Sequence, residues 1–158
     1  MNRTNDVYQT LQALGVTLPP SPADSPYFSI TRPFGGSLLY VSGCGPVIEG
    51  EAHFSGTLPS HVSVEEGRLC ARRCALNIIS ALEAYTGDLN RVKSIVKLLV
   101  YVSSDPGFSE QHLVAHGASG LLLEVFGEAV GKATRSAVGV AALPLDFPVE
   151  IEAVVELE

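Results

Sequence analysis

The closing stretch ATRSAVGVAALPLDFPVEIEAVVELE, residues Ala133–Glu158, decides the fold class of this chain. It holds two runs rich in β-branched residues, TRSAVGVA and VEIEAVVEL, joined by a proline-containing corner, and so predicts two β-strands. In the second run, alternation gives one apolar and one mainly acidic face. The apolar face holds Val149, Ile151, Ala153, Val155 and Leu157, and the other holds Glu150, Glu152, Val154, Glu156 and Glu158.

Two helical patterns precede this stretch. Ser63 and Glu66 form a capping box, and apolar residues then recur at four-three spacing as far as Gly87, which predicts a long amphipathic helix. A second helix is expected to begin with Ser109 as its N-cap and to end at Gly127.

The remaining strands and a short first helix complete the predicted order. Residues 27–43 form two β-rich runs around Gly35-Gly36, which predicts a hairpin, and residues 91–104 predict a central strand. Residues 5–14 have the spacing of a short amphipathic helix. The order β-β-α-β-α-β-β after this helix predicts an α+β fold, a mixed sheet with two main helices packed on one face.

Composition limits the class of protein. With 158 residues, 46% of them hydrophobic and 17% charged, the chain is expected to form a single domain over residues 1–158, with 1–24 as an N-terminal helix and linker extension. No run of about 18 apolar residues is present, so we expect a cytoplasmic protein without a membrane span. A net charge of −7 with scattered basic residues argues against nucleic-acid binding.

Neither the cysteines nor the histidines predict a metal site. Cys44, Cys70 and Cys74 include no CxxC pair, and core packing is the favoured interpretation. Among the histidines, only His112 and His116 have a spacing that could place two ligands on one helix face. We therefore expect no metal.

Arg135 is the only charge in TRSAVGVAAL, which we interpret as a buried strand. A guanidinium among small and apolar residues requires an anion, and its planar donors match a carboxylate. The residues leave two alternatives open: a structural pair with Glu150 across the sheet, or a bound small organic acid.

With TRSAVGVAALPLDFPVEI in view, the sequence resembles the YjgF/RidA family, also called endoribonuclease L-PSP-like. The likeness extends to LLYVSGCGP, to CALNIISALEAYTGDLNRVKSIVKLLVYV and to FGEAVGKATRS, and covers roughly Tyr27–Leu157. Residues 45–62 and the first two dozen residues vary or are unmatched.

The resemblance implies a chorismate-mutase-like fold, a homotrimer with clefts between subunits, and no cofactor. It implies an enzyme of the 2-iminobutanoate/2-iminopropanoate deaminase type, which hydrolyses enamines and imines such as 2-aminoacrylate to 2-keto acids and ammonia. In that family pattern, Arg135 matches the arginine that binds the substrate carboxylate, and Glu150 matches the glutamate that positions water. Tyr27 resembles a tyrosine that closes the cleft, and Ser42 a serine that lines it.

Three positions depart from the family pattern, and each is expected in the substrate-binding cleft. Ala137 stands where many members carry a cysteine, Cys44 where a glutamine is frequent, and His116 where an asparagine is expected. The alternative to catalysis is a trimeric protein that binds a small carboxylate through Arg135 without turnover. A ribonuclease is disfavoured by the net charge.

Overall fold

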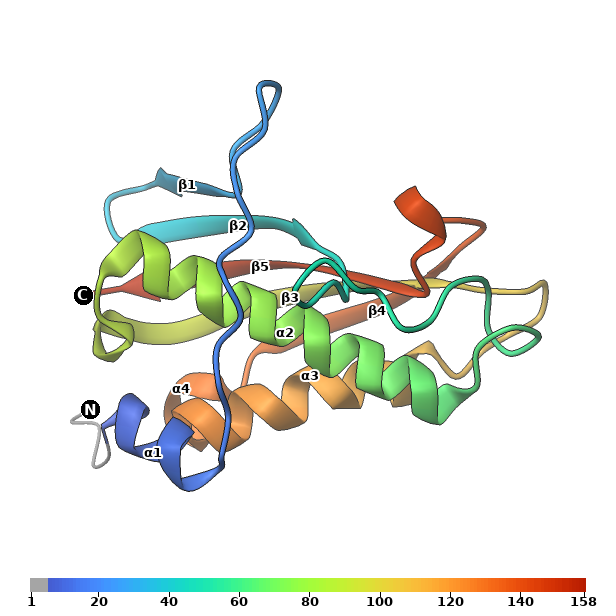
Figure 1. The fold of residues 1–158 in the computed structure, drawn as a ribbon. Coiled ribbons are helices and arrows are strands. Elements are labelled where there is room, and N and C mark those ends of the chain that lie inside the picture. The colour runs from blue at the N-terminus through green and yellow to red at the C-terminus, as the bar shows by residue number, and fades with distance from the viewer. Residues whose placement is uncertain (1–5) are drawn as a thin grey trace.

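A computed structural model describes residues 6–158 and shows a mixed five-stranded sheet with helices on one face (Figure 1). The helical elements are α1 (Val7–Ala13), α2 (Val64–Thr86), η1 (Leu89–Arg91), α3 (Gln111–Phe126), α4 (Glu128–Gly131) and η2 (Pro144–Asp146). The strands are β1 (Thr31–Phe34), β2 (Leu38–Cys44), β3 (Val92–Ser103), β4 (Thr134–Val140) and β5 (Val149–Leu157). The predicted α+β class, element order and hairpin are confirmed.

The sheet has the order β1-β2-β5-β3-β4. Only β3 and β4 pair in parallel; the other neighbours are antiparallel. On the apolar face of β5, Val149, Ile151, Ala153 and Val155 are buried beneath α2 and Leu157 is partly buried, as the alternation of this strand predicts. We call this the helix face of the sheet, and the opposite face, to which Glu150 and Glu152 belong, the open face.

Helix α2 begins and ends where local sequence predicts. The Ser63 hydroxyl accepts a hydrogen bond from the Glu66 N–H, the Glu66 carboxylate accepts one from the Ser63 N–H, and Gly87 ends the helix in the left-handed region at φ 67°. Against it, α3 passes so closely that a Cβ on Gly117 would collide with the backbone carbonyl of Arg68. This glycine therefore permits the two helices to cross.

Two sequence-based expectations are wrong. Helix α3 has Glu110 at its N-cap, without a side-chain cap, so Ser109 does not cap it. Strand β4 is not buried: it lies at the edge of the sheet, and every one of its residues is at least partly exposed. Local periodicity does not specify which strand lies at the edge, because that depends on the crossover through α3.

The N-terminal extension packs on the domain. Val7 and Leu11 of α1 are buried, and the Tyr8 hydroxyl donates to the Glu83 carboxylate at 2.6 Å. The expected helix over residues 5–14 is confirmed as α1, except that residue 5 lies outside the described residues. Residues 19–22, here called the proline strap, then cross α2 toward the sheet (Figure 1).

The excursion over residues 45–62 is held by α2. Arg73 donates to the carbonyls of Pro46 and Glu51, each at 2.8 Å, and Asn77 donates to those of Gly45 and Val47 at 2.9 and 2.7 Å. No helix in the described part of the chain is both long and apolar enough to cross a membrane.

Candidate functional site

Arg135 lies on the helix face of β4. It is in register with Leu98, which is fully buried beneath the helices. One guanidinium nitrogen donates to the Ser119 hydroxyl at 3.0 Å, and the other terminal nitrogen donates to the His112 carbonyl at 3.3 Å. Neither partner is charged, and no ion pair of Arg135 occurs within residues 6–158. Partial burial lowers the pKa of Arg135, but a guanidinium remains charged at neutral pH.

Glu150 lies on the open face, opposite to Arg135. Glu150 is in register with Tyr101 of β3, whereas Arg135 is in register with Leu98, three residues earlier on the same strand. Strand β3 lies between β4, which carries Arg135, and β5, which carries Glu150. The structural pair of Arg135 with Glu150 is therefore not formed within this chain. Burial, followed by the charge of Glu152, raises the pKa of the Glu150 carboxyl.

A bulge in β2 shapes the region beside Glu150. Val41 opposes Ala153 and Cys44 opposes Ile151, so the two residues between them, Ser42 and Gly43, oppose a single residue of β5. A Cβ on Gly43 would collide with the Glu150 carboxylate. The glycine thus lets the carboxylate lie directly against the β2 backbone.

The same bulge separates two predicted cleft residues. Ser42 lines a cavity of about 410 Å³ with Arg32, Tyr40 and Glu152 on the open face. Cys44 is buried on the helix face, where it lines a different cavity beneath the proline strap. Regular alternation would place Ser42 and Cys44 on the same face of the sheet. The bulge instead places Cys44 on the helix face.

His116 and Ala137 lie on the same side of the sheet as Arg135. The rings of His116 and His112 meet edge to face with centroids 6.3 Å apart on α3. Desolvation, together with the positive charges of Arg135 and Arg68, lowers the pKa of His116. Ala137 is in register with buried Val100 and so shares the helix face of β4 with Arg135.

Tyr27 lies in the loop between α1 and β1. Its side chain is 95% exposed, in a narrow loop that projects from the sheet between α1 and β1 (Figure 1). Ser25 orders this loop, because its hydroxyl accepts hydrogen bonds from the N–H groups of Tyr27 and Phe28, both at 3.0 Å.

Five of the seven predicted site residues thus lie in two separate groups, here called half-sites, to which Tyr27 and Cys44 do not belong. The cationic half-site contains Arg135, His116 and Ala137 on α3 and β4; the acidic half-site contains Ser42 and Glu150 on β2 and β5. Neither contains the elements of a metal centre: among residues 6–158, no group of three or more His, Cys, Asp or Glu side chains could hold a metal ion.

The family model described as "YjgF/chorismate_mutase-like, putative endoribonuclease" matches residues 9–156. This chain belongs to that family. Protein TCP17 of Trypanosoma cruzi is 46% identical over 151 residues, covering 96% of this chain and 94% of TCP17.

Solved structures of YjgF-family proteins and their relatives have the same fold. The Agrobacterium tumefaciens protein Atu1372, of unknown function, is 38% identical with a TM-score of 0.87, over 96% of this chain and 93% of its own. A Shewanella oneidensis protein with the same endoribonuclease description is 31% identical with a TM-score of 0.91, over 97% and 100%. The Escherichia coli YjgF gene product, 24% identical with a TM-score of 0.62 over 89% and 97%, supports the fold alone.

Sequence reasoning missed the bulge and the role of Gly43 in this YjgF-family chain. One signal was available: Val41 and Cys44 are both apolar but three residues apart, which regular strand alternation cannot place on one face. A bulge between them brings both to the helix face. The contact of Gly43 with Glu150 depends on pairing between distant strands and left no local signal.

Proposed function

We propose that this protein hydrolyses small, carboxylate-bearing enamines or imines, such as 2-aminoacrylate and its imine tautomer, to 2-keto acids and ammonia. The reaction takes place in clefts between the subunits of a homotrimer. Membership in the YjgF family supports this class of small-molecule site.

The observation that carries the proposal is that Arg135 has no carboxylate partner among the described residues. Its guanidinium is partly buried and is held in place by Ser119 and the His112 carbonyl, yet no carboxylate of the described chain neutralises it. A guanidinium has five N–H donors in a rigid plane, and these two contacts leave donors free for a bidentate carboxylate. Such an arginine can bind the carboxylate of a small-molecule ligand.

Glu150 supplies the proton transfers. With the substrate carboxylate held by Arg135, the Glu150 carboxylate takes a proton from water while the water oxygen bonds to the imine carbon, and the C=N electron pair becomes the nitrogen lone pair. Glu150 returns this proton to nitrogen, which gives the neutral amine of the tetrahedral intermediate. It then takes the proton of the new hydroxyl group and passes it to nitrogen, so that the C–N bond breaks, the C=O bond forms and ammonia leaves. A carboxyl pKa raised by desolvation suits a group that both accepts and returns a proton.

The separation of the half-sites supports an intersubunit cleft. Arg135 and Glu150 lie on opposite faces of one sheet with β3 between their strands, so one chain cannot bring them to one substrate. The exposed edge of β4, the open face and the projecting loop of Tyr27 are all available to a neighbouring subunit. The cleft then combines Arg135 of one subunit with Glu150 of the next.

Ammonia release from freshly generated 2-aminoacrylate tests the proposal. Arg135→Ala should lower kcat/KM by about 100-fold or more, because a charge-assisted bidentate contact is lost. Arg91→Ala provides the matched control: the Arg91 guanidinium donates to the carbonyls of Thr86 and Glu158, which belong to neither half-site, so turnover should be unchanged. Unchanged turnover in Arg135→Ala would refute the assignment.

His116 supports a second candidate function, a trimeric carboxylate-binding protein without turnover. It adds a polar ring beside Arg135 where the family pattern has an asparagine, and a ring N–H could donate a hydrogen bond to a bound anion. Binding of pyruvate that depends on Arg135, together with no ammonia release above the spontaneous rate, would establish this alternative.

A further inference from the structure

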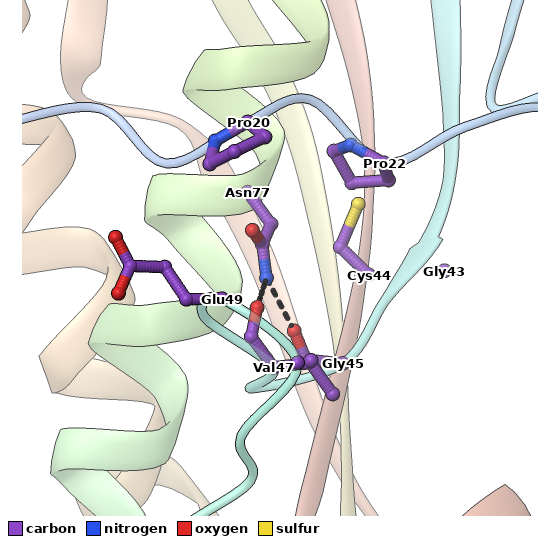
Figure 2. Close-up of a pocket in the computed structure, with 9 residues that line it drawn as sticks. Pro20, Pro22, Gly43, Cys44, Gly45, Val47, Glu49 and Asn77 are labelled. Atoms are coloured by element: carbon purple, nitrogen blue, oxygen red, sulfur yellow. Dashed lines mark hydrogen bonds between the residues drawn. The ribbon is translucent and has the colours of Figure 1, made fainter.

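A cavity of about 370 Å³ lies between the proline strap and the helix face of the sheet, separate from the cationic half-site and on the other side of β2 from Ser42. Its walls are Pro20 and Pro22 from the strap, Cys44 from β2, Val47 from the excursion and Asn77 from α2 (Figure 2). This volume is within the range of about 300–1,000 Å³ typical of small-molecule sites.

Asn77 leaves one strong polar atom without a partner in this cavity. The residue is only 5% exposed. Both amide hydrogens are used, by the Gly45 and Val47 carbonyls, which fixes the orientation of the amide. The amide oxygen accepts no hydrogen bond from any described residue, and Figure 2 shows it on the side of the amide that faces Pro20.

The proline strap and Cys44 supply no donor to this oxygen. Pro20 and Pro22, which line the same cavity as Asn77, have no backbone N–H to donate. The Cys44 thiol points toward Pro22, and its hydrogen-bond contact is with the Ser42 carbonyl at 3.5 Å. The oxygen is not fully shielded from solvent, so a donor that enters the cavity can reach it and take the place of water.

The same residues indicate the character of such a ligand. Proline rings, the Val47 side chain and a thiol form a mainly apolar wall. The only charged lining residue is Glu49, which is exposed and whose carboxylate points away from Asn77 in Figure 2. Burial raises the pKa of Cys44 to about 12, so its thiol is protonated at neutral pH and unsuited to covalent capture.

We propose that this cavity is a second ligand site, which binds a small, neutral, largely apolar molecule that donates one N–H or O–H hydrogen bond to the Asn77 amide oxygen. The proposal does not depend on imine hydrolysis. It assigns a binding role to the N-terminal extension, because the proline strap forms one wall of the site.

Indole and indene form a suitable probe pair, because the rings have similar size and only indole has an N–H donor. In a titration of the ¹⁵N-labelled full-length protein, indole should give saturable shifts of the Asn77 side-chain amide and of the Gly43, Gly45 and Gly50 backbone amides. Indene should bind about tenfold more weakly, the factor expected for one lost hydrogen bond to a buried acceptor.

Val47→Phe should fill the cavity and abolish saturation. Leu123→Phe, at a partly exposed position on α3, is the matched control and should leave indole binding unchanged. Should Val47→Phe disturb folding, intermolecular NOEs between indole and the protons of Pro20 and Val47 in the wild type decide the question instead. Absence of these NOEs, absence of saturable shifts, or equal affinity for indole and indene would overturn the proposal and leave ordered water as the partner of Asn77.

Discussion

At the scale of single residues, Glu150 links stability to catalysis through its pKa. Because burial and the charge of Glu152 raise this pKa above 4.5, the folded state favours the protonated carboxyl. Its contribution to stability is therefore present below the ordinary pKa and is lost as the pH rises through the folded-state pKa. A neutral isostere should retain that contribution at neutral pH.

Glu150→Gln is accordingly expected to abolish imine hydrolysis while raising the free energy of unfolding at pH 7. The gain should be below about 1 kcal/mol, since the half-exposed carboxylate is screened by water. At pH 4 the variant and the wild type should be nearly equal in stability. Urea denaturation at the two pH values measures this. Glu156→Gln is the control: it removes the ion pair with Lys93 and should not stabilise the protein.

Gly43 should be necessary for full activity. An added methyl group at Gly43 would occupy the position of the Glu150 carboxylate and force that flexible side chain to move. Gly43→Ala should therefore lower kcat by about tenfold or more, because a displaced base no longer meets the water. Its thermal unfolding should change little. Wild-type kcat in this variant would show that the position of Glu150 against β2 is not required.

These residues also show how far the sequence predicts the site. Arg135 and Glu150 could be selected because a lone guanidinium and an acid at the start of a strand are chemically unusual in their local sequence. The residues that contact Arg135 and Glu150 could not be predicted from the sequence. Ser119 and the His112 carbonyl reach Arg135 only because α3 packs beside β4, and Gly43 reaches Glu150 only because β2 pairs with β5.

At the scale of elements, local signals predicted both ends of α2 and the end of α3 at Gly127, but not the start of α3. The capping box and Gly87 act within one turn of the chain, so the sequence specifies both ends of α2. Ser109 had the right residue type for a cap, but the chain turns helical only at Gln111, after the Asp105 turn docks against residues 57–60. The edge position of β4 likewise follows from a crossover, which periodicity does not encode.

Two glycines of α3 should respond in opposite ways to the same substitution. Nothing lies within 4 Å of a Cβ built on Gly120, so Gly120→Ala should raise the free energy of unfolding by about 0.5–1 kcal/mol through helix propensity. Gly117→Ala would collide with the Arg68 carbonyl and should lower it by more than about 1 kcal/mol as α2 and α3 are forced apart. Urea denaturation of the pair tests the helix crossing, and stabilisation by Gly117→Ala would contradict it.

At the scale of the whole molecule, the five-stranded sheet has helices on one face and polar side chains on the other. A single chain thereby carries Arg135 and Glu150, the two main residues of the proposed site, on different faces. Oligomerisation is then a requirement of the proposed chemistry, and light scattering in dilute buffer should show a trimer. A monomer with full activity would exclude the intersubunit cleft.

Mixing two inactive variants tests the cleft directly. In a trimer with one heterologous interface per neighbouring pair, Arg135→Ala subunits still supply Glu150, and Glu150→Gln subunits still supply Arg135. Each mixed trimer regains one intact cleft of its three, so random exchange at equal amounts should restore about one quarter of wild-type activity. Each variant alone should remain inactive. If both residues acted within one chain, every cleft in every mixture would lack one of them, and refolding the two variants together would restore nothing.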